Sequence, residues 1–159
     1  MNPAEQLINQ FYTSFGQKDL KGILNCYHPE ATFSDPVFGK LSSKEVKAMW
    51  HLLATRGKDL ELTFSDIKAN ETNGSCHWEA RYTFSKTGRK VHNKINASFR
   101  FRDGKIIEHR DQFDLYKWMR MALGIPGLLL GWTPFLQNKV RKAAKADLAA
   151  FIKKHPEYQ

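Results

Sequence analysis

The first third of the chain places apolar side chains at the three- and four-residue spacing of amphipathic helices. This pattern predicts a helix from about residue 3 to Gly16, and a second, short helix that Asp19 caps and Pro29 stops. A third helix should begin at Ser42-Ser43-Lys44-Glu45, which is typical of a capping box. The buried positions expected on these helices are Leu7, Ile8, Phe11, Tyr12 and Phe15, then Leu20, Ile23, Leu24 and Tyr27, then Val46, Met49, Trp50 and Leu53.

From Leu60 onward the apolar positions alternate with polar ones, which is the period of β-strands. The parity changes after Phe64, so we expect a bulge near Ser65-Asp66. Turns are predicted at Asn73-Gly74, Thr87-Gly88 and Asp103-Gly104, because asparagine, aspartate and glycine tolerate the backbone angles of tight hairpins. A brief strand is also expected at 31–35, between the second and third helices. The predicted order is therefore mainly helices, followed from Leu60 by a meander of strands.

After Asp114 the period becomes helical again, over about 115–124. An apolar segment follows, IPGLLLGWTP, whose prolines and glycines break a long helix, and a basic helix is expected over 135–153. The tail has two interpretations: a solvated helix packed on the domain, or a lid or membrane-surface helix. In the second interpretation the exposed apolar contacts are Leu128, Leu129, Leu130 and Trp132.

Together these elements predict an α+β protein in which helices cover one side of a curved antiparallel sheet. If the sheet is strongly bent, the space between the sheet and the helices becomes a pocket. At 159 residues the chain has the size of one domain.

Composition narrows the possible classes of protein. Hydrophobic residues make up 42% and aromatic residues 13% of the chain, which excludes a disordered protein. No segment has the pattern of a membrane span or signal peptide, and Cys26 and Cys76 do not make a disulfide framework, so we expect a cytoplasmic protein. The net charge of +9 leaves nucleic acid or anionic lipid as a further partner, although no nucleic-acid-binding module accompanies it.

The segment FRFRDGKIIEHRDQFD, residues 99–114, carries polar groups on an apolar strand face. On its second arm His109 and Asp111 share a face with Ile107 and Phe113, because strand side chains alternate. An imidazole beside a carboxylate in apolar surroundings is typical of acid-base sites. The alternative is that the two side chains satisfy each other as a structural pair.

Two segments resemble a known family: LINQFYTSFGQKDLKGILNCYHPEATFSDPV at 7–37 and the FRFRDGKIIEHRDQFD ending. They resemble the ketosteroid isomerases and their SnoaL-like relatives of the nuclear transport factor 2-like superfamily. The resemblance covers roughly residues 5–118 and implies a cone-shaped, strongly curved sheet wrapped by N-terminal helices, an apolar pocket, and frequent dimers. It divides the chain into a cone domain at 1–118, followed at 119–159 by an apolar segment and an extra C-terminal helix packed on it.

The resemblance also suggests roles for individual residues. Asp35, in ATFSDPV, falls where the isomerases carry their catalytic base, but Phe11 and Ala97 stand where those enzymes carry two hydrogen-bond donors for the oxyanion. Asp111, in RDQFD, matches the acid-base aspartate of SnoaL-type cyclases and limonene-epoxide hydrolase. The arginine and aspartate that the hydrolases add correspond at best to Glu79 and Arg81, which are in reversed order and on the outer face.

The candidate site therefore combines acid-base groups with apolar walls. We assign Asp111, His109 and Asp35 to catalysis, and Asn93 either to ligand binding or to satisfying a strand end. The remaining ligand-binding candidates are Trp78, Tyr82, Phe99, Phe101, Phe113, Phe11, Tyr12 and Trp50.

No cofactor or metal is expected, since His77 with Glu79 and His109 with Asp111 lie on opposite faces and imply no third ligand. The expected partners are a small hydrophobic or weakly acidic ligand and a second copy of the chain. The outward row of His77, Glu79, Arg81 and His92 would suit a polar dimer interface. Three hypotheses stay open: a proton-transferring enzyme, a non-catalytic binding module, and a basic surface protein for nucleic acid or anionic lipid.

Overall fold

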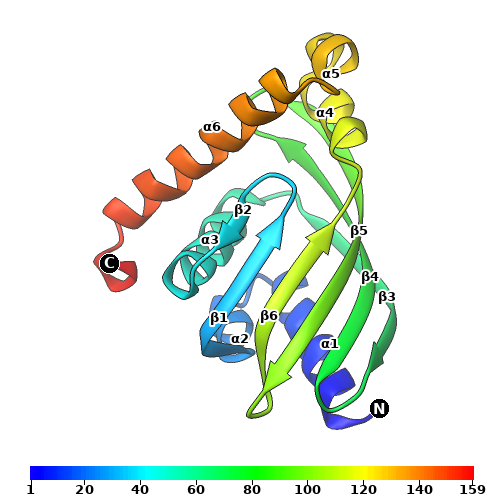
Figure 1. The fold of residues 1–159 in the computed structure, drawn as a ribbon, viewed down its shortest axis with the longest axis vertical. Coiled ribbons are helices and arrows are strands. Elements are labelled where there is room, and N and C mark those ends of the chain that lie inside the picture. The colour runs from blue at the N-terminus through cyan, green and yellow to red at the C-terminus, as the bar shows by residue number, and fades with distance from the viewer.

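The computed structural model describes residues 1–159 and contains one six-stranded sheet with helices on its inner side (Figure 1). The strands lie in the order β2-β1-β6-β5-β4-β3. Their bounds are Tyr27–Asp35 (β1), Gly39–Leu41 (β2), Glu61–Ala69 (β3), Asn73–Phe84 (β4), Arg89–Arg102 (β5) and Lys105–Gln112 (β6). The α+β prediction is confirmed, and one neighbouring pair, β1 with β6, is parallel rather than antiparallel.

The helices begin where the sequence places capping residues. They are Pro3–Gly16 (α1), Leu20–Asn25 (α2), Ser43–Arg56 (α3), Leu115–Leu123 (α4), Ile125–Leu130 (α5) and Pro134–Lys153 (α6), followed by a 3₁₀ turn at Pro156–Tyr158. The carboxylate of Asp19 accepts from Gly22 N–H at the start of α2, and Ser42 N–H donates to the Glu45 carboxylate at the start of α3. The predicted helix starts are therefore confirmed.

Two local predictions are wrong. Tyr27 does not extend the second helix but begins β1, because it pairs with Ile106 of β6 and tertiary pairing overrides helical spacing. The turn before β4 lies at residues 70–72 rather than at Asn73-Gly74. The side chain of Asn70 accepts from the N–H groups of Thr72 and Asn73, which closes the turn early and makes Asn73 the first residue of β4.

The hairpin between β5 and β6 follows its sequence signal. Asp103 and Gly104 have φ of 53° and 71°, the positive values that a two-residue hairpin of this kind requires. The predicted bulge in β3 is also present, since Asp66 has φ of 56° and the register with β4 shifts after Ser65.

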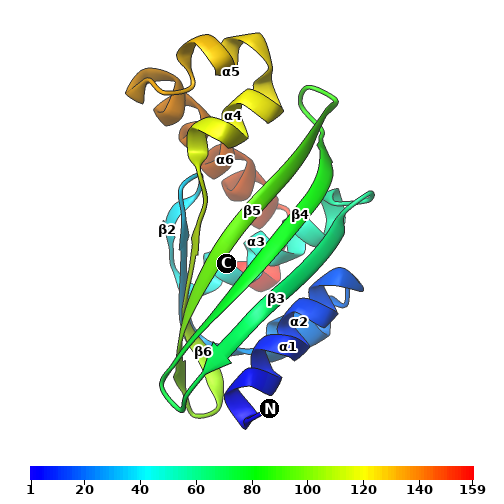
Figure 2. The same ribbon diagram turned by 90° about the vertical axis from the view of Figure 1, so that its right-hand side faces the viewer.

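The sheet curves around α1 and α3, and the last helix crosses to the same side of the molecule (Figures 1 and 2). Leu148 of α6 and Tyr158 of the final turn are buried in the same hydrophobic core as Phe11, Trp50 and Phe99. The C-terminal segment is therefore packed against the core. None of the helices combines the length and the apolar character needed to cross a membrane.

We predict that Leu148→Ala lowers the free energy of unfolding by about 2–5 kcal/mol, because it removes a fully buried side chain and leaves a cavity. Leu128→Ala is the matched control, since Leu128 is half exposed and its loss should change stability by less than about 0.5 kcal/mol. Urea unfolding followed by circular dichroism measures both values. Equal, small effects would mean that α6 is not part of the core.

Candidate functional site

A cavity of about 450 Å³ lies between the inner face of the sheet, α3, α4 and α6. Twenty of its thirty lining residues are hydrophobic, so it suits a compact and largely apolar ligand. The other ten lining residues include Asp35, Asn93 and Asp111. Both carboxylates assigned from the sequence therefore face one cavity.

Asp111 is held by two N–H donors that come from different strands. Its Oδ1 accepts from His109 Nε2 at 2.9 Å and from Trp78 Nε1 at 3.3 Å. Its Oδ2 has no hydrogen-bond partner within the protein, and the side chain is 5% exposed where it meets the cavity. One oxygen thus fixes the carboxylate, while the other is available to a ligand.

His109 is completely buried and reaches the cavity only through Asp111. Its Nδ1 lies 2.7 Å from the hydroxyl of Tyr27. The carboxylate of Asp111 can only accept, so His109 Nε2 carries a hydrogen and Nδ1 accepts from Tyr27. Burial, and secondarily the charge of Asp111, raise the pKa of Tyr27 well above its usual value, which keeps the hydroxyl protonated as the donor. The network therefore fixes the tautomer of His109.

Asp35 stands at the end of β1 in a different environment. Its Oδ1 accepts from the backbone N–H groups of Val37 at 2.9 Å and Phe38 at 2.6 Å. Burial raises the pKa of Asp35 to about 7, and the charge of Asp111 adds to the rise, although the Phe38 N–H opposes it. Asp35 can therefore hold or release a proton near neutral pH.

Asn93 of β5 is 7% exposed and its side-chain amide makes no hydrogen bond within the protein. The sequence left open whether this amide satisfies a strand end, and it does not. Its amide atoms are not among the fully buried polar atoms without a partner, which are the Tyr12 hydroxyl and the Trp50 indole N–H, so they meet the open space of the cavity. Its position in the cavity wall makes it available to a polar group of a ligand.

The aromatic candidates fall into two groups. Trp78, Tyr82, Phe113 and Trp50 line the cavity. Phe11, Tyr12, Phe99 and Phe101 are not among its lining residues. Phe99 and Phe11 instead pack on the imidazole of His109, with ring centroids at 4.4 Å and 5.5 Å, so they hold the polar network rather than face the ligand space.

Sequence reasoning missed two parts of the site. Helical spacing places Tyr27 on the second helix, although Tyr27, Ala31, Phe33 and Asp35 are all odd-numbered and so share one strand face if the strand starts early. The sequence predicts α6 as a helix packed on the domain or as a lid, but not that Asp147 is part of the cavity wall, because helical spacing does not say which surface a terminal helix covers.

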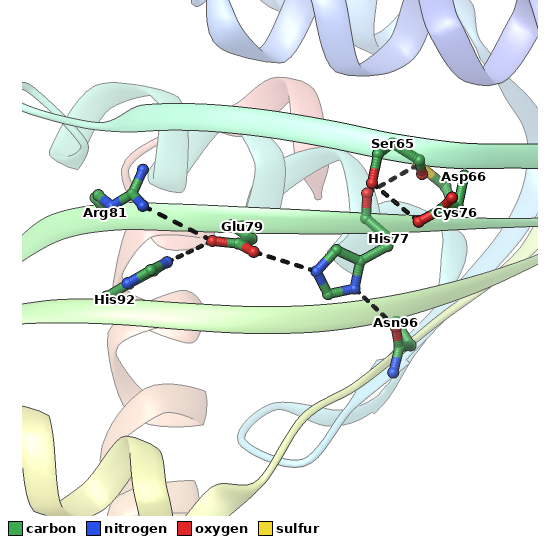
Figure 3. A network of polar contacts seen from close by, with 8 residues as sticks. All are labelled: Ser65, Asp66, Cys76, His77, Glu79, Arg81, His92 and Asn96. Carbon is green, nitrogen blue, oxygen red and sulfur yellow. Dashed lines mark hydrogen bonds and ion pairs between the residues drawn. The ribbon is translucent and has the colours of Figure 1, made fainter.

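The outer face of the sheet carries a separate polar network (Figure 3). Glu79 accepts from His92 and from His77, and lies beside Arg81. Hydrogen bonds from the histidines keep the pKa of Glu79 below its usual value. The predicted outward direction of this row is confirmed, and Glu79 and Arg81 are not among the residues that line the cavity.

One group of metal-ligand side chains lies away from the cavity. Ligand atoms of His51, His155 and Glu157 are within 4.8 Å of one another. The Nδ1 of His51 bonds to the Tyr158 hydroxyl, which ties the C-terminus to α3, and the Nδ1 of His155 donates to the Phe151 carbonyl, while neither Nε2 has a hydrogen-bond partner. This group is not part of the candidate site, because none of its three residues lines the cavity.

Thiol chemistry has no support in the structure. Cys26 and Cys76 are both buried and unbonded to each other. Burial raises the pKa of Cys26 to about 11 and that of Cys76 to about 12, so neither forms the reactive thiolate near neutral pH.

Comparison with known proteins agrees with this architecture. The family model described as a SnoaL-like domain matches residues 8–109. No curated protein matches the chain. The structure of a nuclear transport factor 2-like protein of unknown function from Burkholderia pseudomallei superposes with a TM-score of 0.67, at 22% identity over 76% of this chain and 98% of that one.

Two further solved structures share the fold at low identity. An epoxide hydrolase of the limonene-epoxide-hydrolase-like kind from M. tuberculosis has a TM-score of 0.65 and 16% identity, over 82% of this chain and 98% of its own. IdmH from Streptomyces antibioticus, provisionally described as a polyketide cyclase, has a TM-score of 0.64 and 22% identity, over 79% of this chain and 100% of its own. The chain belongs to the SnoaL-like domain family, whose model matches about two thirds of its length.

We predict that Tyr27→Phe lowers the free energy of unfolding by about 1–3 kcal/mol, because it leaves the buried Nδ1 of His109 without a donor. Tyr116→Phe is the control, since the Tyr116 hydroxyl makes an exposed bond to the Leu128 carbonyl. Chemical denaturation measures both, and ¹⁵N NMR of the imidazole reports the tautomer. An unchanged tautomer population and stability in Tyr27→Phe would contradict the network.

We predict that folding stability decreases as pH rises from about 4 to about 7. The folded pKa of Asp35, about 7, lies above its value near 4 in the unfolded chain, so the folded state retains a proton that the unfolded state loses. The contribution is fully present below pH 4 and is lost through pH 7, on the order of 3–4 kcal/mol. Asp35→Asn should remove this pH dependence while keeping the acceptor for the two backbone N–H groups.

Denaturant unfolding at several pH values measures the slope, and ¹³C NMR of the Asp35 carboxyl gives the titration directly. A carboxyl that titrates near pH 4, with equal slopes in the two proteins, would contradict the prediction.

Proposed function

We propose that this protein is an enzyme that moves protons on a compact, largely apolar ligand, with Asp111 as the acid-base group. The observation that carries the proposal is that two carboxylates in unlike environments line one apolar cavity, each with an oxygen free of protein partners. Pairs of titratable groups whose surroundings differ in this way are typical of acid-base sites.

Because their environments differ, the two carboxylates have different roles in this scheme. Asp111 Oδ2 is placed to take a proton from a carbon next to a carbonyl, while His109 acts as a positioning residue through Oδ1. Asp35, with its pKa near 7, can donate to or accept from the ligand at neutral pH. No step of this scheme requires an organic cofactor or a metal.

Stabilisation of a developing oxyanion falls to different groups than in the steroid isomerases. Phe11 and Ala97 supply no donor, and Ala97 is the register partner of Asp111 on β5. The amide of Asn93 and the protonated form of Asp35 are two donors that the cavity offers instead. This set suits isomerisation or ring closure of a carbonyl compound.

The solved neighbours include an epoxide hydrolase and a protein provisionally described as a polyketide cyclase, which supports a ligand-binding pocket of the same general use. Their identity to this chain is too low to transfer a reaction. Hydrolysis is the less favoured reaction here, because Glu79 and Arg81 lie on the outer face and hold no water in the cavity.

We predict that the wild-type protein accelerates exchange of α-hydrogens for deuterium in a small cyclic ketone, for which 1-tetralone and substituted cyclohexanones are suitable probes in D₂O. Asp111→Asn should lower the exchange rate by about 10²–10⁴-fold, the usual contribution of a general base. Asp35→Asn should lower it less and alter its pH profile near 7. Mass spectrometry of the recovered ketone measures the exchange.

The control for this experiment is Asp66→Asn, which changes an exposed carboxylate in the β3 bulge and should leave exchange unchanged. Thermal unfolding of each variant establishes that it is folded. Wild-type exchange rates in both Asp111→Asn and Asp35→Asn would overturn the assignment.

The second candidate function is a non-catalytic module that holds a hydrophobic or weakly acidic ligand. The observation in its favour is that the donors of the isomerases and the water-holding pair of the hydrolases are both missing from the cavity. Lys139 and Arg56, which line the cavity, would suit an acidic group. Ligands that bind with no deuterium exchange in any probe would support this function over the first.

We also propose that the protein forms a homodimer and works in a reducing compartment. The network of His77, Glu79 and His92 on the outer face of the sheet would suit the homodimer interface expected from the family resemblance. Two buried, unpaired cysteines are in keeping with a reducing compartment such as the cytoplasm.

A further inference from the structure

Six large apolar side chains gather at one end of the molecule, on α5 and the start of α6. They are between 49% and 76% exposed: Ile125, Leu128, Leu129, Leu130, Trp132 and Phe135. We call this group the apolar tip. Figures 1 and 2 show α5 projecting at this end, beyond the strands of the sheet. Apart from Met1, these are the only exposed large hydrophobic residues of the protein.

The tip is held in place by its own packing. Gly127 is buried against α4, and a Cβ added there would lie 2.0 Å from the Met119 carbonyl oxygen, so only glycine permits this close contact. Because the glycine side of α5 faces the protein, its leucines face outward. The Tyr116 hydroxyl donates to the Leu128 carbonyl, and the indole of Trp132 donates to the Leu129 carbonyl. The exposed side chains therefore sit on an ordered element.

The segment that carries the tip has charge of one sign only between Asp114 and Asp147. Residues 115–146 contain six lysines and arginines and no acidic residue. Every ion pair of the protein lies elsewhere, so all six cations are unpaired: Lys117, Arg120, Lys139, Arg141, Lys142 and Lys145. Lys117, Arg120 and Lys139 are the cations nearest to the tip in sequence, whereas Arg141 donates to the Pro36 carbonyl and Lys145 lies beside Gly39. An exposed apolar group flanked by unpaired cations is complementary to the surface of an anionic bilayer, which offers both hydrocarbon and phosphate.

We propose that the apolar tip docks on anionic membrane surfaces, with its leucines and Trp132 at the boundary between headgroups and acyl chains. A second copy of this chain is a poorer occupant, because apposed tips would bring like charges together without acidic partners. No helix spans the membrane in this arrangement, and the protein lies on the surface.

The location of the tip also bears on the ligand. The segment that carries it supplies cavity wall on both sides of α5, with Trp118 and Leu123 before it and Leu136 and Val140 after it. A ligand that partitions into the bilayer would thus meet the protein next to its cavity. This step rests on the proposed function, whereas docking itself does not.

The test measures binding of the full-length protein to sedimented vesicles. Phosphatidylcholine vesicles with a quarter phosphatidylglycerol should bind it at low salt, and binding should weaken as salt rises or when phosphatidylglycerol is omitted. Trp132 is exposed whereas Trp50, Trp78 and Trp118 are buried, so a blue shift of tryptophan fluorescence on binding reports the tip. Trp132→Phe should bind without the shift.

Two matched charge variants isolate the surface. Lys117→Gln/Arg120→Gln/Lys139→Gln should lower partitioning roughly a hundredfold, at about a factor of five for each cation. Lys44→Gln/Lys68→Gln/Lys94→Gln removes the same charge from exposed, unpaired lysines elsewhere and should bind nearly as well as wild type. Leu128→Ser/Leu129→Ser should abolish the fluorescence shift without changing thermal stability, because both side chains are exposed.

Equal loss in both charge variants would overturn the proposal, since binding would then follow net charge alone. A second result would also overturn it. If the wild type does not bind vesicles, and light scattering gives Leu128→Ser/Leu129→Ser a different molecular mass from the wild type, the tip serves self-association instead. Asn93→Leu separates docking from the proposed function: it alters the cavity and should leave vesicle binding unchanged.

Discussion

The buried carboxylate of Asp111 is the constraint on which the rest of the site depends. A carboxylate in an aromatic core is costly unless donors surround it, and here two N–H groups converge on its Oδ1. One donor is His109, which is itself buried and so requires Tyr27 on its other nitrogen. The network therefore couples β4, β6 and β1, and a one-residue slip in the register of any of them would leave a buried polar group without a partner.

The two ends of the molecule are held by different forces. At the α1 and α3 end, interlocking aromatic rings around Trp50 and Phe11 fix the network from behind. Across the cavity, α6 is fastened by Asp147 to Lys86 at 2.9 Å and to Arg56 at 3.4 Å, partly exposed pairs that contribute at most about 1 kcal/mol each. Leu148, which is buried in the core, and the bond between His51 and the Tyr158 hydroxyl hold the same side of the molecule as well.

Local rules predicted much of this structure and failed where distant segments decide the outcome. Asp103-Gly104 fixed a hairpin and strand parity placed Asp111 inside, because both depend on neighbours in sequence. Tyr27 was misplaced since its partner, His109, lies 82 residues away. The same limit applies to the cavity: parity tells which residues face inward, but it does not distinguish those that meet a ligand from Phe99, which packs on His109.

The polar groups of the cavity are costly for a protein that uses this space only as core. A purely structural role accounts for the bonds of His109 and of Asp111 Oδ1. It gives no account of the free Oδ2 of Asp111, of the Asn93 amide, which has no partner within the protein, or of Asp35, whose burial raises its pKa to about 7. Burial of the Asp35 carboxyl lowers stability by an amount that an apolar residue of similar size would avoid, and the Asn93 amide keeps its unpaired atoms at the cavity surface. Both line the cavity together with the free oxygen of Asp111, so a ligand that hydrogen-bonds to all three would offset the cost. A carbonyl compound with an acidic neighbouring hydrogen has that arrangement, since its oxygen can accept from Asn93 and Asp35 while its hydrogen faces Asp111.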